Sequence, residues 1–519
     1  MFIESLEPRR LLSASALPRL VHHRDQTFDP SDGFTPAQTI KAYGFTGINF
    51  GGIAGDGSGQ TIAIVDAYDD AKIVEDLAVF DAQFSLPAPP SFQKVNQIGG
   101  TNLPKSNAAW ASEIALDVEW AHAIAPQANI LLVEARSGSE TNLVAAANYA
   151  ASAPGVSVVS MSWGFNESKR QLTLDGELAA PAGHPGVTFV AAGGDSGPAA
   201  GAGWPAVSPQ VLSVGGTSLT LKDQSGTYGH EISWDSTGGG YSTMEPQPQW
   251  QLGAQSTGAR SAPDVSYDAD PNTAFAVYDS IPYQDTTGWQ QIGGNSAGTP
   301  QWAALIAIAD QGRALAGRAS LDGVTQTLPA LYGLYSAPGT GGYANYTTFF
   351  NDVKDAANAT DVQAVAGYDT ATGLGTPHAA NIINALVGVT TSQTPPTPPI
   401  TQFSATFSSI MPIGVISAHH SSATISLRSL AGALALGTAN VTLYASTDLS
   451  LDSSDMLLTT LDTKTIRLAV HHRKQLKLRF TAPGAQQGGT YYLIASVTFT
   501  PSAGGAATTL TAVVGTTAD

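Results

Sequence analysis

The sequence predicts a chain of two domains, an α/β domain with a doubly wound parallel sheet followed by a small all-β domain. Between residues 31 and 389, short and almost continuously apolar segments alternate with helical segments, a pattern typical of a parallel sheet covered by helices on both faces. Residues 390–401 are rich in Pro and Thr, which is typical of an extended linker. From 402 to 519, polar and apolar residues alternate in short runs separated by turns, which predicts a β-sandwich.

Composition and charge limit the functions that the chain can have. The 519 residues include no cysteine, and 41 acids against 23 bases give a net charge of −18. Seven of the bases and five of the acids follow residue 402, so the acidic excess lies wholly in the first four hundred residues, which hold 16 bases and 36 acids. An acidic surface argues against nucleic-acid binding and suits a soluble, secreted enzyme. No run approaches the roughly 18 apolar residues that span a bilayer.

Residues 1–30 do not have the pattern of a domain, and we expect them to form a leader without fixed structure. Residues 11–17 form a short apolar core, but residues 1–4 lack the basic start of an ordinary signal peptide. Residues 6–13, Leu-Glu-Pro-Arg-Arg-Leu-Leu-Ser, resemble an N-terminal motif of large exported proteins in some environmental bacteria. This resemblance implies export from a bacterial cell; the alternative is a disordered tail.

The α/β domain is expected to place polar residues at one edge of its sheet. The expected strands are 61–65, 129–135, 156–161, 187–192 and 211–214, and the expected helices are 73–80, 110–124, 141–151 and 301–309. In such sheets, sites form at the carboxyl ends of the strands. The residues at three of these ends are Asp66, the segment 162–164 and the segment 195–197.

A serine stands at a glycine turn before one of these helices. Residues 293–300 read Gly-Gly-Asn-Ser-Ala-Gly-Thr-Pro, and an apolar, Ala-rich segment follows. Glycines allow a tight turn and a close approach of another chain, so Ser296 could be an exposed nucleophile. Serine is also a preferred helix N-cap, and proline suits a first turn. The local pattern favours the cap.

Two carboxylates share one face of the helix expected at 110–124. Glu113 and Asp117 are four residues apart and their neighbours are apolar, so this helix is expected to be largely buried. Buried carboxylates side by side are costly unless they share a proton or serve a purpose. The alternative is a charged outer face, which Glu119 favours. The local pattern leaves these two interpretations equal.

A nucleophilic serine needs a general base, usually a histidine. None of the ten histidines lies in the His-Gly-Thr-His setting of the subtilisins. His122 follows Asp117 on the same helix, but at a different angle around the helix axis. Glu113 supported by Asp117 is the remaining candidate. A histidine-dependent serine protease is the alternative that this leaves open.

Several separated motifs together resemble the sedolisins, or serine-carboxyl peptidases, which have a subtilisin-like fold with a glutamate in place of the histidine. The resemblance extends from about residue 34 to residue 387, and its motifs occur in the family's order. The matching segments are 113–117, 160–164, 192–197, Trp234 with 238–240, 263–266, and 294–296 with Pro300.

By this resemblance, the catalytic residues form a Ser-Glu-Asp triad. Ser296 would be the nucleophile, Glu113 the general base and acid, and Asp117 its orienting partner. Asp195 would lie in the oxyanion hole as a protonated carboxyl group, and Asp66 would extend the proton network. A carboxyl group donates to an oxyanion only while protonated, so we expect an acidic pH optimum, below about 6.

The resemblance also implies how substrate is bound. Ser162, Trp163 and Gly164 would hold the substrate backbone. The implied function is that of a secreted or cell-surface bacterial endopeptidase that acts on proteins and peptides. The alternative is a catalytically inactive or weakly active homologue that acts in binding or adhesion through the sandwich, which resembles the immunoglobulin-like adhesion modules of bacterial exoenzymes. Such a module could contact a cell surface or a polysaccharide.

The resemblance implies one structural calcium ion near the end of the α/β domain. Two aspartates with flexible backbone between them can supply carboxylate and carbonyl oxygens to Ca²⁺. The residues that match the family's ligands are Asp352, Val353, Val365, Gly367 and Asp369. The alternative is a polar loop. One further departure concerns the nucleophile, because Asn295 stands where the family nearly always has threonine.

Overall fold

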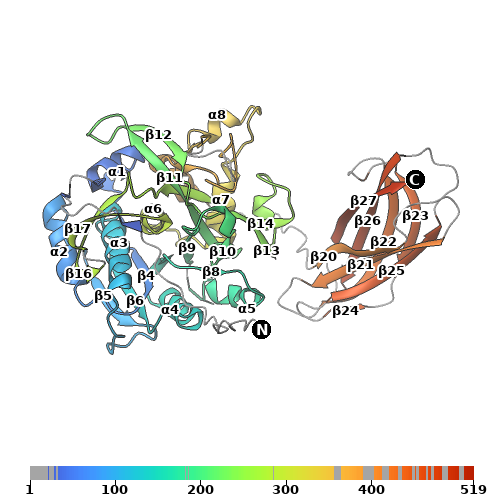
Figure 1. Cartoon of the computed structure of the whole chain (residues 1–519), viewed down its shortest axis with the longest axis horizontal. Helices are drawn as coiled ribbons and strands as arrows, with labels where there is room; N and C mark the ends of the chain where they lie inside the picture. The colour runs from blue at the N-terminus through green and yellow to red at the C-terminus, as the bar shows by residue number, and fades with distance from the viewer. Residues whose placement is uncertain are drawn as a thin grey trace, which may run out of the picture. The chain divides into compact units, whose positions relative to one another are not determined.

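The computed structural model divides the chain into two units, Met1–Val389 and Thr390–Asp519 (Figure 1). It describes residues 33–389, apart from 182, 185, 284–285 and 356–363, together with 21–22, 29–30 and the strands of the second unit. Most of the expected leader and all of the expected linker lie outside the described residues. In the part of the chain that is described, no helix has the length and apolar character needed to cross a membrane.

The first unit is built on an eight-stranded sheet, which confirms the predicted fold class. All neighbouring strands are parallel except β12, which pairs antiparallel with β11. In spatial order the strands are β12 (Tyr228–Ser233), β11 (Val211–Leu221), β9 (Thr188–Ala192), β7 (Val156–Met161), β4 (Thr61–Ala67), β6 (Asn129–Ala135) and β5 (Phe92–Asn96), with β15 (Val265–Asp268) also on β11.

Helices cover both faces of this sheet because its central strands are apolar on both sides. Ile62 and Ile64 of β4 belong to a core shared with α3 and α6, whereas Ala63 and Val65 point to the opposite face and share a core with α4. The helices are α1 (Pro36–Ala42), α2 (Ile73–Phe84), α3 (Ala108–Ile124), α4 (Glu140–Ser152), α5 (Gln171–Leu174), α6 (Asn295–Leu315), α7 (Leu328–Gly333), α8 (Tyr343–Tyr346) and α9 (Ala379–Gly388).

The predicted strand boundaries agree best at the buried centre of the sheet. The bounds of β6 and β7 are those predicted, whereas β11 runs seven residues beyond the predicted end at Val214, where it pairs with β12. Strand β5 was not predicted, because it lies at the edge of the sheet and is only partly buried. Further strands of this unit are β1 (Val21–His22), β2 (Asn49–Phe50), β3 (Ile53–Ala54), β8 (Phe165–Asn166), β10 (Gly203–Trp204), β13 (Gly240–Pro246), β14 (Ala259–Ala262), β16 (Phe275–Tyr283), β17 (Thr286–Gly293), β18 (Phe350–Asn351) and β19 (Thr376–Pro377).

The second unit consists of two antiparallel sheets around one apolar core, which agrees with the predicted all-β region. One sheet has the order β20-β21-β25 and the other β23-β22-β26-β27, with β24 on β22. Buried side chains from both sheets, including Ile425 and Val441, form a single cluster. The strands are β20 (Phe403–Met411), β21 (His420–Ser429), β22 (Ala435–Ser446), β23 (Met456–Asp462), β24 (Ile466–Leu468), β25 (Arg473–Thr481), β26 (Gly489–Pro501) and β27 (Thr508–Ala518).

Candidate active site

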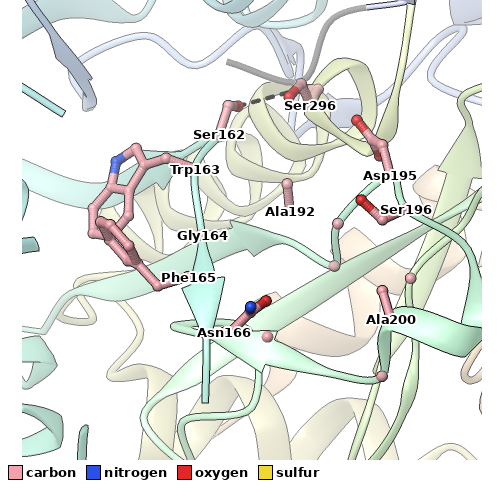
Figure 2. Close-up of a pocket in the computed structure, with 15 residues that line it drawn as sticks. Ser162, Trp163, Gly164, Phe165, Asn166, Ala192, Asp195, Ser196, Ala200 and Ser296 are labelled. Carbon is pink, nitrogen blue, oxygen red and sulfur yellow. Dashed lines mark hydrogen bonds between the residues drawn. The ribbon is translucent and has the colours of Figure 1, made fainter. Parts of the chain in front are cut away.

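The predicted nucleophile lies in a pocket at the carboxyl edge of the central sheet. Ser162 follows β7, Asp195 follows β9, and Ser296 follows the turn between β17 and α6; all three line the same pocket. Figure 2 shows Ser162 and Asp195 on either side of Ser296. Trp163 and Phe165 form an apolar wall of the pocket, with ring centroids 6.0 Å apart.

Two glycines allow the sharp turn that precedes the nucleophile. Gly294 has a φ of 111°, which a residue with a side chain rarely adopts. A Cβ atom on Gly293 would lie only 2.5 Å from the carbonyl oxygen of Ala269. Helix α6 therefore begins at Asn295, with Gly294 as its N-cap and no side-chain cap. The interpretation of Ser296 as a helix cap is wrong, because this serine lies within the first turn.

Pro300 changes the hydrogen bonding of the nucleophile's backbone. It lies four residues after Ser296 inside α6, and because proline has no N–H, the Ser296 carbonyl lacks its usual helical donor. The Ser162 hydroxyl lies 3.5 Å from this carbonyl oxygen (Figure 2). It also donates to Oδ1 of Asp117 at 2.9 Å. Ser162 thus connects Asp117 to the nucleophile, a connection that no pattern in the sequence indicated.

The helix that carries the two carboxylates is buried. Glu113, Asp117 and Glu119 of α3 are all 0% exposed, so the interpretation as a charged outer face is wrong. Glu119 is buried on another side of the helix, where its Oε2 accepts the backbone N–H of Tyr278 at 3.0 Å. The apolar neighbours of Glu113 and Asp117 therefore predicted the burial of this helix correctly, whereas Glu119 wrongly indicated an exposed face.

The carboxylates of α3 and β4 perturb one another. Burial raises the pKa of Asp66 to about 8. Burial, and then the charges of Asp66 and Asp195, raise the pKa of Glu113 well above its usual range, while the Ser296 hydroxyl acts in the opposite direction. Burial and the charges of Asp66 and Glu113 likewise raise the pKa of Asp117. The cluster consequently retains protons at pH values where exposed carboxylates have lost them.

These buried carboxylates have few compensating partners. Neither oxygen of Asp66 has a hydrogen-bond partner among the described residues, and Glu113 has only the Ser296 hydroxyl nearby, in a contact too loose to have the geometry of a hydrogen bond. No Lys, Arg or His in the described part of the chain forms an ion pair with Asp66, Glu113 or Asp117. Buried polar groups with so few partners are rare in folded proteins. Loosely formed contacts of this kind are common at catalytic sites without substrate, so the cluster has the character expected of such a site.

Asn295 joins the nucleophile helix to the loop that carries Asp195. Its backbone N–H donates to Oδ1 of Asp195 at 2.8 Å, and its Nδ2 donates to the carbonyl oxygen of Gly194 at 2.9 Å. A second contact runs from Nδ2 to Oγ1 of Thr237 at 3.2 Å. The residue that departs from the family pattern is thus a principal contact between the two loops of the site.

His122 faces a different part of the molecule. Its Nε2 lies 2.8 Å from the carbonyl oxygen of Pro87 and 3.2 Å from Oδ1 of Asp81. It is completely buried at these contacts, and it lines no part of the pocket around Ser296. The geometry therefore does not support His122 as the base for this serine.

The predicted calcium ligands come together in two adjoining loops. The N–H of Gly367 donates to Oδ1 of Asp352 at 2.8 Å, and the N–H of Val365 donates to Oδ2 of Asp369 at 2.9 Å. Burial raises the pKa of Asp369 to about 6, although several backbone N–H groups oppose this shift. Among the described residues no group of three or more His, Cys, Asp or Glu side chains could hold a metal ion, so a cation here would depend on backbone carbonyl oxygens as well.

The donor set nevertheless suits calcium. The carbonyl oxygens of Val353, Val365 and Gly367 accept no hydrogen bond from the described residues, and two carboxylates with carbonyls form the all-oxygen set that Ca²⁺ prefers. The Tyr343 hydroxyl and Lys354 Nζ both contact Asp352 Oδ2, the latter at 3.5 Å. Lys354 supplies part of the positive charge that this carboxylate would otherwise receive from a cation.

Comparisons with known proteins agree with the motifs and the fold. Residues 100–328 match the profile of the subtilase family. Kumamolisin of Bacillus sp. (strain MN-32) is 33% identical over 395 residues, which is 70% of this chain and 65% of kumamolisin. Sedolisin of Pseudomonas sp. (strain 101) is 32% identical over 203 residues, 34% of this chain and 33% of sedolisin.

A solved structure of Pseudomonas sedolisin, described as a serine-carboxyl proteinase in complex with two molecules of pseudo-iodotyrostatin, supports the same fold. It superposes with a TM-score of 0.57 at 24% identity, over 68% of this chain and 97% of that one. The chain spans slightly less than two thirds of the length of kumamolisin. The chain is therefore similar in sequence to kumamolisin and sedolisin, and its first unit has the fold of Pseudomonas sedolisin.

Proposed function

We propose that this chain is a serine-type endopeptidase that hydrolyses peptide bonds of proteins at acidic pH through Ser296, Glu113 and Asp117. The observation that carries the proposal is the buried carboxylate cluster beside a serine that lines a pocket. Among the described residues, no histidine, lysine or arginine is paired with Glu113 or Asp117. A carboxylate is then the base, and this base functions in an acidic medium.

The first chemical step is the attack of Ser296 Oγ on the scissile carbonyl carbon. The proton of the hydroxyl passes to Glu113, which later donates it to the leaving amine. Asp117 acts through Glu113. The negative charges of the two carboxylates repel each other, so the two groups resist being ionised at the same time. Ser162 donates to Asp117 and so favours the ionised form of that carboxyl group. The proton is thereby shared over the cluster.

Asp195 is proposed to stabilise the oxyanion of the tetrahedral intermediate. The carboxyl group lies near Ser296 (Figure 2), and the N–H of Asn295 donates to its Oδ1. A proton on the carboxyl group makes it a hydrogen-bond donor to a developing negative charge. The backbone N–H of Ser296 lies in the first turn of α6, where no intrahelical acceptor exists, and it is suited to the same oxyanion.

The raised pKa values determine how the rate should depend on pH. Glu113 must be ionised to act as the base, but a proton lost from Asp66 or Asp117 adds a negative charge near the negative transition state, so the rate falls as the pH rises through the raised pKa values of these two groups. At the acidic limit, full protonation of Glu113 removes the base. Because the proposed oxyanion donor Asp195 must be protonated, we propose an optimum below about 6 and little activity at pH 8.

We further propose that Asp352 and Asp369, with the carbonyl oxygens of Val353, Val365 and Gly367, hold one structural Ca²⁺ ion that ties the two loops together. The oxygen-only donor set supports this assignment. Secretion or display at the bacterial cell surface is proposed from the acidic charge and from the N-terminal motif. Attachment to a surface or a polysaccharide is proposed for the second unit.

The experiment compares the wild type with Ser296→Ala in casein and peptide hydrolysis between pH 3 and pH 8, with calcium present. Ser152→Ala is the matched control, because this serine lies on the surface of α4. We expect cleavage that is greatest in acid, lost in Ser296→Ala and retained in the control. Absence of Ser296-dependent cleavage at every pH would overturn the proposal and favour an inactive binding protein.

A further inference from the structure

A second pocket lies on the same edge of the central sheet, on the opposite side of β4 from Ser162. We call it the basic pocket. Its volume is about 550 Å³. Residues from four separate segments line it, and those that matter here are Tyr68, Asn96, Gln97, Leu103, Lys105 and Arg136.

The strand order places the basic pocket within reach of an extended substrate. Along the edge, β7 is followed by β4, β6 and β5; Ser162 follows β7, Arg136 follows β6, and Asn96 ends β5. Neighbouring strands are about 4.8 Å apart, so these two pocket residues lie roughly 10 and 14 Å along the edge from Ser162. An extended chain advances about 3.3 Å per residue, which puts the pocket about three or four residues from a bond held at Ser296.

The wall of the basic pocket is attached to the catalytic helix. The Tyr68 ring lies with its centroid 6.4 Å from that of Trp110, which precedes Glu113 by three residues on α3. The N–H of Asp69 donates to the carbonyl oxygen of Lys105 at 3.1 Å. These contacts hold the segment before α3 against the end of β4, which carries Asp66.

The loop after β5 is also held in place. The Asn96 side chain accepts the N–H groups of Ile98 and Gly100 at 3.0 and 2.9 Å. The Gln97 side chain accepts the N–H of Arg136 at 2.8 Å, which joins the ends of β5 and β6. The pocket therefore has a defined shape before any ligand binds.

Two cations at the basic pocket have no acidic partner. Lys105 and Arg136 are exposed, and neither forms an ion pair with a described residue. The nearby carboxylates Asp69 and Glu134 lie 2.8 and 3.7 Å from Lys94 instead. In a chain with a net charge of −18, two such cations at one pocket form a local site for a negative charge.

We propose that the basic pocket binds the carboxylate of an Asp or Glu side chain in the substrate, three or four residues from the scissile bond, and so determines substrate specificity. Lys105 and Arg136 would contact the carboxylate, while Tyr68 and Leu103 would contact its methylene groups. The inference rests on the proposed peptidase activity.

The test uses quenched fluorescent peptides in which one position, two to five residues on either side of a fixed scissile bond, carries Glu or Gln. Rates are measured near pH 5.5, where the Glu side chain is ionised. We expect the wild type to cleave the Glu peptide with a kcat/KM about fivefold or more above that of the Gln peptide at three or four residues. This preference should decline at high salt.

Variants at the pocket make the test specific. Lys105→Gln/Arg136→Gln should lower the Glu/Gln ratio to about one and leave the Gln peptide unaffected, and Lys105→Glu/Arg136→Glu should invert the preference towards a Lys peptide. Lys41→Gln/Lys222→Gln removes the same charge from exposed sites elsewhere and should keep the wild-type ratio. An equal Glu/Gln ratio in the wild type and the pocket variants would overturn this inference alone, whereas absence of Ser296-dependent cleavage of every peptide would overturn the proposed peptidase activity.

Discussion

The Asn295 side chain should contribute to catalysis through Asp195, and replacing it tests the geometry of the site directly. Asn295→Ala removes the hydrogen bonds from Nδ2 to the Gly194 carbonyl oxygen at 2.9 Å and to Thr237 Oγ1 at 3.2 Å. The backbone bond from residue 295 to Asp195 remains possible. The substitution therefore loosens the loop that carries Asp195 without removing either reacting group.

The size of the effect follows from the hydrogen bonds lost. Removing a donor and leaving a buried acceptor unsatisfied costs about 1–3 kcal/mol, which is roughly a 5- to 150-fold change if all of it appears in the transition state. Loss of a whole oxyanion donor costs about 10²–10³-fold in kcat. We expect Asn295→Ala to lower kcat by about tenfold, which is less than the loss expected for removing a whole oxyanion donor. KM should change little, because the oxyanion exists only in the transition state.

The assay is a double-mutant cycle with Asp195→Asn, measured as kcat and KM on one peptide at the pH optimum. If Asn295 acts through Asp195, the Asn295→Ala substitution should have little further effect in the Asp195→Asn background. Full additivity would refute the reasoning. Asn295→Thr should retain part of the activity through its hydroxyl, and Asn272→Ala, in a surface turn, is the matched control.

The remaining predictions concern stability, the base and the metal. The folded pKa values of Asp66 and Asp70 are raised to about 8 and about 7, so the folded state holds protons that the unfolded state releases above about pH 4. The free energy of unfolding should therefore fall between pH 4 and pH 8, by up to about 1.4 kcal/mol per pH unit for each retained proton. Tm should fall with it, and a rising Tm would contradict this prediction. Glu113→Gln should abolish cleavage yet raise Tm at pH 7, because it removes a buried acid, and a residual rate near that of the wild type would exclude Glu113 as the base. His122→Gln should leave the pH dependence of kcat unchanged, whereas loss of activity in a folded variant would favour a histidine-dependent mechanism. A calcium chelator should lower the Tm of the wild type but not that of Asp369→Asn, and an identical response of both proteins would argue against the proposed site.

Local patterns in the sequence predicted the fold because the buried strands are nearly independent of context. Residues 129–135 and 156–161 are mostly apolar, and almost all of them are buried, as expected for strands of a parallel sheet between two helical layers. The same patterns failed at the margins. Strand β5 is half exposed, and the extension of β11 depends on its hairpin with β12.

Local patterns predicted the candidate site less completely. The segment around Ser296 favoured a helix cap, and only the φ of Gly294 shows that the helix begins one residue before this serine. Glu113 and Glu119 appear equally charged in the sequence, and their burial comes from packing against segments far away in the chain. The basic pocket combines residues from positions 68 to 136, and no single motif marks it.

The sequence by itself predicted the fold class, the resemblance to the sedolisins and the residues proposed for the site. The tertiary structure decided which of these residues meet: it placed Asp66 beside Glu113 and Asp117, connected Ser162 to both Asp117 and the Ser296 carbonyl, and brought the Asp195 loop to Asn295. The physical reason is that propensity and apolar periodicity act over a few residues. The pKa of a carboxyl group instead depends on burial and on charges a few ångströms away, and those distances are determined by packing between strands and helices that are remote in the chain.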